Sequence, residues 1–300
     1  MPPLCKVEKN AIKESSLKSC VCVIGLLLCC LGLAANSFAS TSASDPRFEV
    51  PRSTVIELQD EATSRTYPLF IKLPRSYHAN TDNHYPVIYL TDALYSFQIA
   101  SGASRYPMNI GRMDEAIIVA VSYSKGSKGA TSRVRDYTPS KASDWKMQTG
   151  DAEQHALFIR DNVIPYIEKN YRTQQQRRTF VGNSLGGLFG AYLLFKHPDM
   201  FASYILGSPS VWFNNHDILV AKVIKPTSPV KVYVAVGSLE RPEFGQKNDM
   251  VVGAEQLVKK ITAQSGEQIT LKFVVIDGAK HATAFPTTLI QGLDWIYGKP

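Results

Sequence analysis

The chain has 300 residues, of which 44% are hydrophobic and 20% are charged, with 19 glycines and 17 prolines. This is the composition of an ordinary globular protein, and it excludes a disordered chain, collagen and a coiled coil. The 33 basic and 26 acidic residues give a formal net charge of +7. This surplus is scattered, and a pair such as Arg177 and Arg178 is typical of a solvated face, so we expect no nucleic-acid partner.

Residues 1–39 have the features of a secretory signal peptide. A lysine-rich head precedes the apolar run 20–35, and Ser37-Phe38-Ala39 provides the small residues of a cleavage site. Since a membrane span needs roughly 20 residues, this shorter run predicts cleavage after Ala39 and no stable membrane insertion afterwards. A lipoprotein acylated at Cys29 or Cys30 is the alternative, although neither cysteine follows the small residue that such a site prefers.

All five cysteines lie in the first 30 residues, so the mature chain would contain none. It would then have no disulfide, no thiolate nucleophile and no cysteine-based metal site. Export without disulfides favours a bacterial periplasm or cell surface, and we expect a secreted or periplasmic protein. No repeat or long linker interrupts the rest of the chain, which predicts a single domain over residues 40–300.

Short apolar runs rich in β-branched residues predict eight strands, and helical patterns separate the later ones. Continuous apolar strands that alternate with helices indicate an α/β protein with a mostly parallel central sheet and helices on both faces. The first two runs, joined by a polar turn, predict an antiparallel hairpin at the sheet edge. Residues 124–150 have no clear period and predict a long functional loop. The expected strands are 53–58, 67–73, 86–90, 116–122, 178–181, 202–206, 230–236 and 270–276, and the expected helices are 152–169, 186–196, 250–264 and 287–297.

The strongest motif is Gly182-Asn183-Ser184-Leu185-Gly186, which matches the G-x-S-x-G nucleophile elbow. A strand pattern precedes it and a helix pattern follows it, as this sharp turn requires. The turn would lift the Ser184 hydroxyl above the sheet and aim the Leu185 N–H at a reacting carbonyl. We therefore predict Ser184 as nucleophile and Leu185 as an oxyanion donor; the alternative is a Gly/Ser turn without a catalytic role.

A serine hydroxyl needs a base to become a nucleophile, and the chain order of this motif is serine, acid, histidine. His281 lies in the glycine-bearing loop after the last strand, where an α/β-hydrolase presents its base. His216 lies in a polar loop after the elbow, so chain order alone does not exclude it as the base. Glu240 is the first carboxylate beyond strand 230–236 and is predicted to orient the imidazole of His281. The rival carboxylates are Glu243, Asp249 and Asp277.

The second oxyanion donor is expected in the loop after an early central strand. In PVIYLTDALY, residues Ala93 and Leu94 follow strand 86–90 directly, and the N–H of either is a candidate. Because the loss of one such donor raises the barrier by about 3 kcal/mol, this loop matters as much as the acid.

These motifs and several longer stretches resemble the Putative esterase family of α/β-hydrolases, which includes esterase D-like enzymes and the ferric enterochelin and salmochelin siderophore esterases. The resemblance implies a serine esterase with no metal or organic cofactor, acting on a small-molecule ester. It covers most of residues 67–290 in family order, through YPVIYLTDALYSF, RVRDYTPS, FIRDNVIPYIEKNYRT, RRTFVGNSLGGLFGAYLLFKHPDMF, LGSPSVWF and GAKHATAFP.

The same resemblance implies roles for individual residues. The elbow serine and the histidine of GAKHATAFP match the family nucleophile and base. Arg133 matches a position that faces the substrate in the siderophore branch; the alternative is an ion pair with Asp136 that holds its loop. Trp212 matches a residue beside the nucleophile, where it packs the pocket wall or touches substrate. The family acid is variable, so the resemblance does not identify it, and Glu240 is predicted only from its position directly after strand 230–236.

The sequence thus predicts an exported serine hydrolase that cleaves carboxylic esters through an acyl-enzyme. Siderophore lactones, simple acyl esters and acetylated sugars or drugs stay open as substrates, and the oligomeric state is not indicated. Two other functions remain open. One is an acyltransferase on the same fold, which would pass the acyl group to a hydroxyl other than water. The other is a binding module that has kept the fold without the chemistry.

Overall fold

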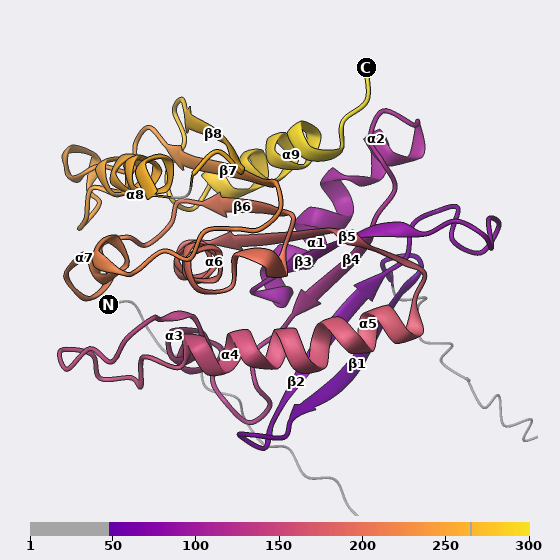
Figure 1. Ribbon diagram of the computed structural model, residues 1–300, viewed down its shortest axis with the longest axis horizontal. Helices are drawn as coiled ribbons and strands as arrows, with labels where there is room; N and C mark the ends of the chain where they lie inside the picture. The colour runs from indigo at the N-terminus through magenta and orange to yellow at the C-terminus, as the bar shows by residue number, and fades with distance from the viewer. Residues whose placement is uncertain (1–47, 265) are drawn as a thin grey trace, which may run out of the picture. The chain divides into compact units, whose positions relative to one another are not determined.

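All eight predicted strands exist and form one sheet in the order β1-β2-β4-β3-β5-β6-β7-β8 (Figure 1). The computed structural model describes residues 48–264 and 266–300, so the predicted signal peptide, its cleavage site and the lipoprotein alternative lie outside the described residues. β2 runs antiparallel to both of its neighbours, and all the other pairings are parallel. The edge hairpin and the mostly parallel sheet are confirmed. The strands are β1 (Ser53–Asp60), β2 (Arg65–Lys72), β3 (Tyr85–Leu90), β4 (Ile117–Val121), β5 (Thr173–Asn183), β6 (Ser203–Gly207), β7 (Val230–Gly237) and β8 (Ile269–Ile276).

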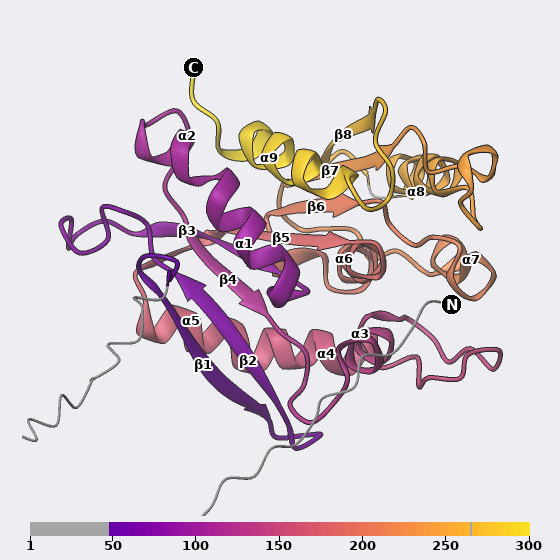
Figure 2. The ribbon, with the colours of Figure 1, turned by 180° about the vertical axis from the view of Figure 1, so that it is seen from behind.

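Helices cover both faces of this sheet, as the continuous apolar strands require. Alternate residues of β3 point to opposite sides, so Val87 belongs to one apolar core and Ile88 to the other. The core around Val87 is completed by α3, α4, α5, α6 and α8, and the core around Ile88 by α1 and α9, which lie together in front of the sheet in Figure 2. The helices are α1 (Ala93–Ala103), α2 (Arg105–Asn109), α3 (Gly129–Tyr137), α4 (Ala152–Phe158), η1 (Ile159–Val163), α5 (Ile164–Asn170), α6 (Leu185–Lys196), η2 (Pro198–Met200), α7 (Phe213–Val220), η3 (Pro242–Phe244), α8 (Met250–Gln264) and α9 (Ala284–Tyr297).

The prediction of one long loop over residues 124–150 is wrong, because α3 lies within it. This helix has no apolar period since polar side chains fill much of its buried face. Arg135 Nε donates to Asp136 Oδ1 at 2.7 Å, and Ser132 Oγ donates to Asp136 Oδ2 at 2.8 Å. His216 lies within the span of α7, but its backbone is left-handed and not helical, with φ 63° and ψ 35°.

The helix predicted over residues 152–169 is interrupted by one π-helical turn, η1, between α4 and α5. Pro165 stands in the first turn of α5. A proline has no N–H to donate, so the hydrogen-bond register changes ahead of it.

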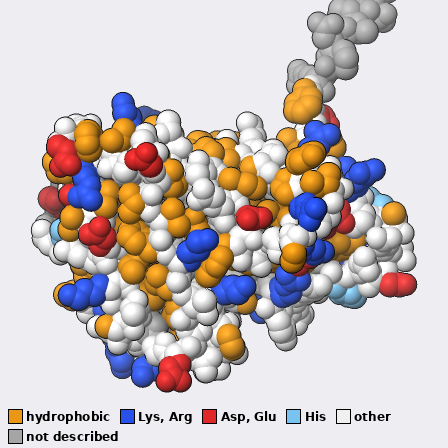
Figure 3. All heavy atoms as spheres, turned by 90° about the horizontal axis from the view of Figure 1, so that it is seen from above, with side chains coloured by type: hydrophobic (Ala, Val, Ile, Leu, Met, Phe, Trp, Pro, Cys, Tyr) orange, Lys and Arg blue, Asp and Glu red, His pale blue; other side chains and the backbone are white. Residues whose placement is uncertain are grey.

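No helix in the described ranges is both long and apolar enough to cross a bilayer. On the face seen in Figure 3, basic side chains are spread among acidic and apolar ones and form no continuous patch.

Candidate active site

Ser184 forms the turn between β5, which ends at Asn183, and α6, which begins at Leu185. Its backbone has φ 59° and ψ −117°, a region that costs a residue with a side chain about 1–3 kcal/mol. The Ser184 N–H donates to the carbonyl of Gly207 at 2.8 Å, which fixes the turn against the end of β6. The sequence motif therefore adopts the strained geometry of a nucleophile elbow.

The glycines on either side of Ser184 are required by close backbone approach. A Cβ on Gly182 would lie 2.1 Å from the carbonyl oxygen of Gly186, and a Cβ on Gly186 would lie 2.4 Å from Thr91 Oγ1. Thr91 follows β3, so the second clash also shows how closely the elbow packs against the loop after that strand. Both positions leave no room for a larger residue.

His281 and Glu240 come from the loops after β8 and β7 and lie in direct contact. Glu240 Oε2 is 2.6 Å from His281 Nδ1, and Glu240 is completely buried. Its other oxygen, Oε1, accepts hydrogen bonds from the Gly237 N–H at 2.7 Å and the Ser208 hydroxyl at 2.6 Å. Since a carboxylate accepts, Nδ1 of the ring carries the proton and Nε2 is left as the basic nitrogen.

None of the rival carboxylates Glu243, Asp249 and Asp277 bonds to His281 in the described part of the chain, and Asp249 instead pairs with Arg241 at 3.4 Å. The Ser184 hydroxyl lies 3.2 Å from the Ser210 hydroxyl and makes no hydrogen bond to His281 among the described contacts. Nucleophile–base hydrogen bonds often tighten only when substrate binds.

The segment after β6 contributes two residues that the sequence analysis did not single out. Ser208 holds Glu240, and Ser210 contacts the Ser184 hydroxyl while its N–H donates to the Ser184 carbonyl at 3.1 Å. The available signal was the position of G-S-P-S directly after a strand that neighbours β5, because carboxyl ends of parallel strands meet at one sheet edge.

The predicted oxyanion donors come from two helix starts at this edge. Leu185 opens α6, and Ala93 and Leu94 open α1 after β3, the parallel neighbour of β5. The first N–H groups of a helix have no acceptor within the helix. Both helix starts follow neighbouring strands that end at the same side of the sheet, and the role of their N–H groups as oxyanion donors stays a prediction.

Arg133 does not pair with Asp136, and that alternative is wrong because Arg135 and Ser132 hold Asp136 instead. Arg133 Nε donates to Asp92 Oδ1 at 2.8 Å, and its Nη2 donates to the carbonyl of Asn183 at 3.0 Å. Burial by itself would lower the pKa of Arg133, but the charge and hydrogen bond of the Asp92 carboxylate raise it overall.

Trp212 lies two residues beyond Ser210 and is half-buried against the core. Its ring stacks on Trp145, with ring centroids 6.2 Å apart and planes 13° apart. Two nearly parallel indole rings from separate segments thus lie against each other, one of them two residues from Ser210.

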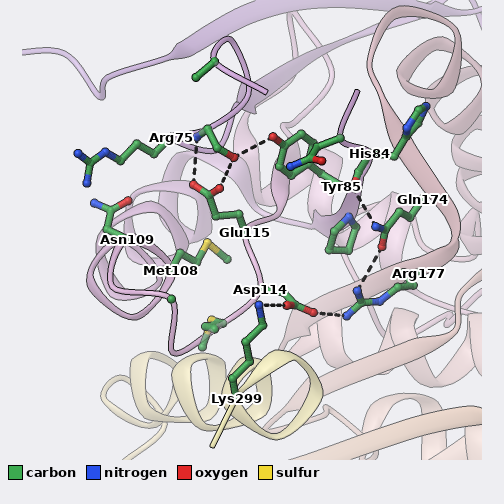
Figure 4. A pocket seen from close by; sticks show the side chains of 16 residues that line it. Arg75, His84, Tyr85, Met108, Asn109, Asp114, Glu115, Gln174, Arg177 and Lys299 are labelled. Atoms are coloured by element: carbon green, nitrogen blue, oxygen red, sulfur yellow. Dashed lines mark hydrogen bonds and ion pairs between the residues drawn. The ribbon is translucent and has the colours of Figure 1, made fainter. Parts of the chain in front are cut away.

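A cavity of about 590 Å³ lies where β3 and β5 begin, at the other end of these strands from Ser184 (Figure 4). Three of its charged groups are paired: Asp114 accepts from Arg177 at 2.6 Å and from Lys299 at 2.7 Å. It contains none of the predicted site residues. Within residues 48–264 and 266–300, no cluster of three or more His, Cys, Asp or Glu side chains could hold a metal ion.

A family model described as Putative esterase matches residues 61–296. The ferri-bacillibactin esterase BesA of Bacillus subtilis strain 168 is 31% identical over 268 residues, which cover 82% of this chain and 90% of that protein. Among solved structures, the BES protein from Bacillus cereus has a TM-score of 0.72 and 28% identity, and the match covers 85% of this chain and 99% of that one. The siderophore hydrolase EstB from Aspergillus nidulans shares the fold, with a TM-score of 0.73, 23% identity, and coverage of 84% and 97%.

Proposed function

The chain belongs to the Putative esterase family, and from that premise we propose that it is an exported serine hydrolase that cleaves carboxylic esters through an acyl-enzyme. The observation that carries the proposal is the strained backbone of Ser184 at the same sheet edge as the Glu240–His281 pair. A signal-like segment over residues 1–39 supports export, to the periplasm or the medium.

The reaction begins when Ser184 Oγ attacks the ester carbonyl and its proton moves to His281 Nε2. The N–H groups of Leu185 and of Ala93 or Leu94 bind the oxyanion that forms on the carbonyl oxygen. The Glu240 carboxylate, which contacts His281 Nδ1, stabilises the imidazolium. When the intermediate collapses, the alcohol leaves with the proton from His281, and Ser184 keeps the acyl group.

Water completes the reaction by attacking the acyl-enzyme, and Ser184 is now the leaving group. His281 takes a proton from the water as it attacks the acyl carbonyl, a second oxyanion forms in the same site, and the bond to Ser184 Oγ breaks. Ser184 recovers its proton from His281 and the carboxylic acid is released. No metal or organic cofactor takes part in this proposal.

The substrate class follows from the relatives and from two side chains beside the nucleophile. The names of BesA and EstB describe an esterase and a hydrolase of siderophores, which supports a siderophore lactone or a similar small ester here. Trp212, stacked on Trp145, offers an aromatic surface to such a ligand. Arg133 is 24% exposed and keeps guanidinium N–H groups beyond the two that hold Asp92 and Asn183, so it is proposed to face the substrate.

The test is hydrolysis of p-nitrophenyl esters from acetate to octanoate by the mature chain, beside Ser184→Ala. We expect activity that the substitution abolishes. A fluorophosphonate label followed by mass spectrometry should mark Ser184; a label on Ser210, whose hydroxyl is 3.2 Å away, would contradict the assignment.

If simple esters are not cleaved, a tri-lactone siderophore is the next substrate, and failure with both would reject the proposed function. Transfer of the acyl group to an added alcohol in place of water would reassign the protein to the acyltransferases.

A further inference from the structure

Asp92 is the residue between the end of β3 and the start of α1, directly before the candidate oxyanion donors. It has φ 57° and ψ 49°, the left-handed conformation, and only 5% of its surface is exposed. An aspartate at this position commonly accepts a hydrogen bond from the first turn of the helix that it precedes. Here the carboxylate makes no such bond, so it is free to serve another purpose.

The Asp92 carboxylate points instead to two side chains from other elements. Oδ1 accepts from Arg133 Nε of α3 at 2.8 Å and from the hydroxyl of Tyr123, which follows β4, also at 2.8 Å. The backbone N–H of Asp92 donates to the hydroxyl of Tyr137 at 3.2 Å. Three side chains therefore hold both the carboxylate and the peptide group of a single residue in an unusual conformation.

The same guanidinium extends this hold to the nucleophile. Arg133 Nη2 donates to the carbonyl of Asn183 at 3.0 Å, and Asn183 directly precedes Ser184. One planar group thus joins the residue before Ala93 to the residue before the nucleophile. Since a guanidinium has a rigid geometry, it fixes the distance between the two backbone segments that carry the oxyanion donors.

We infer that Asp92 is a positioning residue, which sets the oxyanion donors after β3 against the elbow through Arg133. The inference rests on the proposed hydrolase function and deepens it. A buried ion pair contributes little net stability compared with apolar packing, so stability alone is a weak reason for this arrangement. The Asp92 carboxylate raises the pKa of Arg133 against the opposing effect of burial, and burial followed by the Asp92 charge raises the pKa of Tyr123.

The test compares Asp92→Ala with Asp92→Asn, which retains an acceptor oxygen and tolerates the left-handed backbone. A displacement of about 1 Å at a reacting group costs on the order of 100-fold in rate, so Asp92→Ala should lower kcat by about that factor while KM changes less than about threefold. Asp92→Asn should recover kcat to within roughly tenfold of wild type. Active-site titration counts the functional molecules, so a misfolded fraction cannot imitate slow turnover.

The matched control is Asp114→Ala, which breaks an aspartate–arginine pair in the cavity where β3 and β5 begin and should leave kcat unchanged. If Asp92→Ala does not fold, Arg133→Met removes the same link, and it too should lower kcat without moving the pH limits of activity. A kcat for the Asp92 or Arg133 variant within threefold of wild type would overturn the inference while leaving the hydrolase intact.

A second measurement separates this inference from the proposed function. Hydrogen exchange of the backbone amides over residues 91–97 should become faster in Asp92→Ala and stay unchanged in Asp114→Ala, whether or not esters are cleaved. If the wild-type protein hydrolyses no ester, the hydrolase is rejected, whereas faster exchange in Asp92→Ala would still support the role of Asp92 in positioning this segment. Unchanged exchange would reject the positioning role.

Discussion

Replacing Glu240 by glutamine tests how the candidate base is held. The carboxylate has three partners: Oε2 contacts His281 Nδ1 at 2.6 Å, while Oε1 accepts from Gly237 N–H and the Ser208 hydroxyl. The carbonyl oxygen of glutamine can replace only one of these two oxygens. If it stays with Gly237 and Ser208, the amide NH₂ faces His281 and forces Nδ1 to accept. The ring proton then moves to Nε2, the nitrogen that must take the proton of Ser184.

The opposite orientation of the glutamine amide restores the ring but turns NH₂ toward the Gly237 N–H. That N–H would be buried without an acceptor, which costs about 1–3 kcal/mol. The neutral amide also no longer stabilises the imidazolium. Since a wrong tautomer in a serine–histidine–acid site lowers turnover by on the order of 10⁴-fold, we expect Glu240→Gln to lose about 10³- to 10⁴-fold in kcat, or roughly 4–5 kcal/mol.

The assay is kcat for a p-nitrophenyl ester, normalised by active-site titration, with the urea midpoint as a measure of folding. The control is Glu153→Gln, which alters another glutamate–histidine pair, Glu153 Oε2 to His197 Nε2 at 2.9 Å, and should leave kcat unchanged. Retention of more than a tenth of wild-type kcat by Glu240→Gln, with His281→Ala inactive, would refute the orienting role of Glu240.

Two further predictions concern the elbow and the core. Gly182→Ala should lower stability by about 1–3 kcal/mol and kcat by on the order of 100-fold, because its Cβ would lie 2.1 Å from the Gly186 carbonyl oxygen; urea unfolding and ester hydrolysis measure the two effects, and no change in either would contradict the close approach. His155 is buried among aromatic rings, neither of its ring nitrogens has a hydrogen-bond partner among the described residues, and burial lowers its pKa. The unfolded chain therefore binds a proton below about pH 6.5 that the native state does not, so stability should fall as the pH drops through that value. His155→Leu should flatten this dependence in urea unfolding at pH 5.5 and 7.5; equal slopes in both proteins would argue against a neutral buried histidine.

The sheet could be predicted from the sequence because each of its central strands is buried on both faces. Such strands read as continuous apolar runs, and β3, β4, β6 and β7 appear close to their predicted positions. β5 begins at Thr173, before the predicted start at residue 178, because its first six residues are not buried and leave no apolar run. The elbow could be predicted for a related reason. Its strain is local, and the close approach at Gly182 and Gly186 leaves a signature of glycines within five residues.

The sequence analysis missed α1, α2, α3 and α7, and α3 shows one reason. α3 buries Ser132, Arg135 and Asp136, which satisfy one another by hydrogen bonds. A buried face made of polar residues has no apolar period, so the sequence pattern does not predict this helix. α1 follows the buried strand β3 and packs against β4 and α9, and α2 follows α1; neither helix has a side-chain hydrogen bond at its N-cap.

Chain order and strand ends by themselves determined the candidates for the site: Ser184, His281 and Glu240 all follow predicted strands. Only the tertiary structure decided which groups meet, because parallel strands bring the loops after β5, β6, β7 and β8 to one edge. That convergence selects Glu240 over its rivals and adds Ser208 as its support. It also gives Arg133 a partner from a distant loop, Asp92, where the sequence suggested a neighbour three residues away. The pattern of apolar residues in a segment indicates which of its side chains are buried. Contacts between segments depend instead on the order of the strands in the sheet.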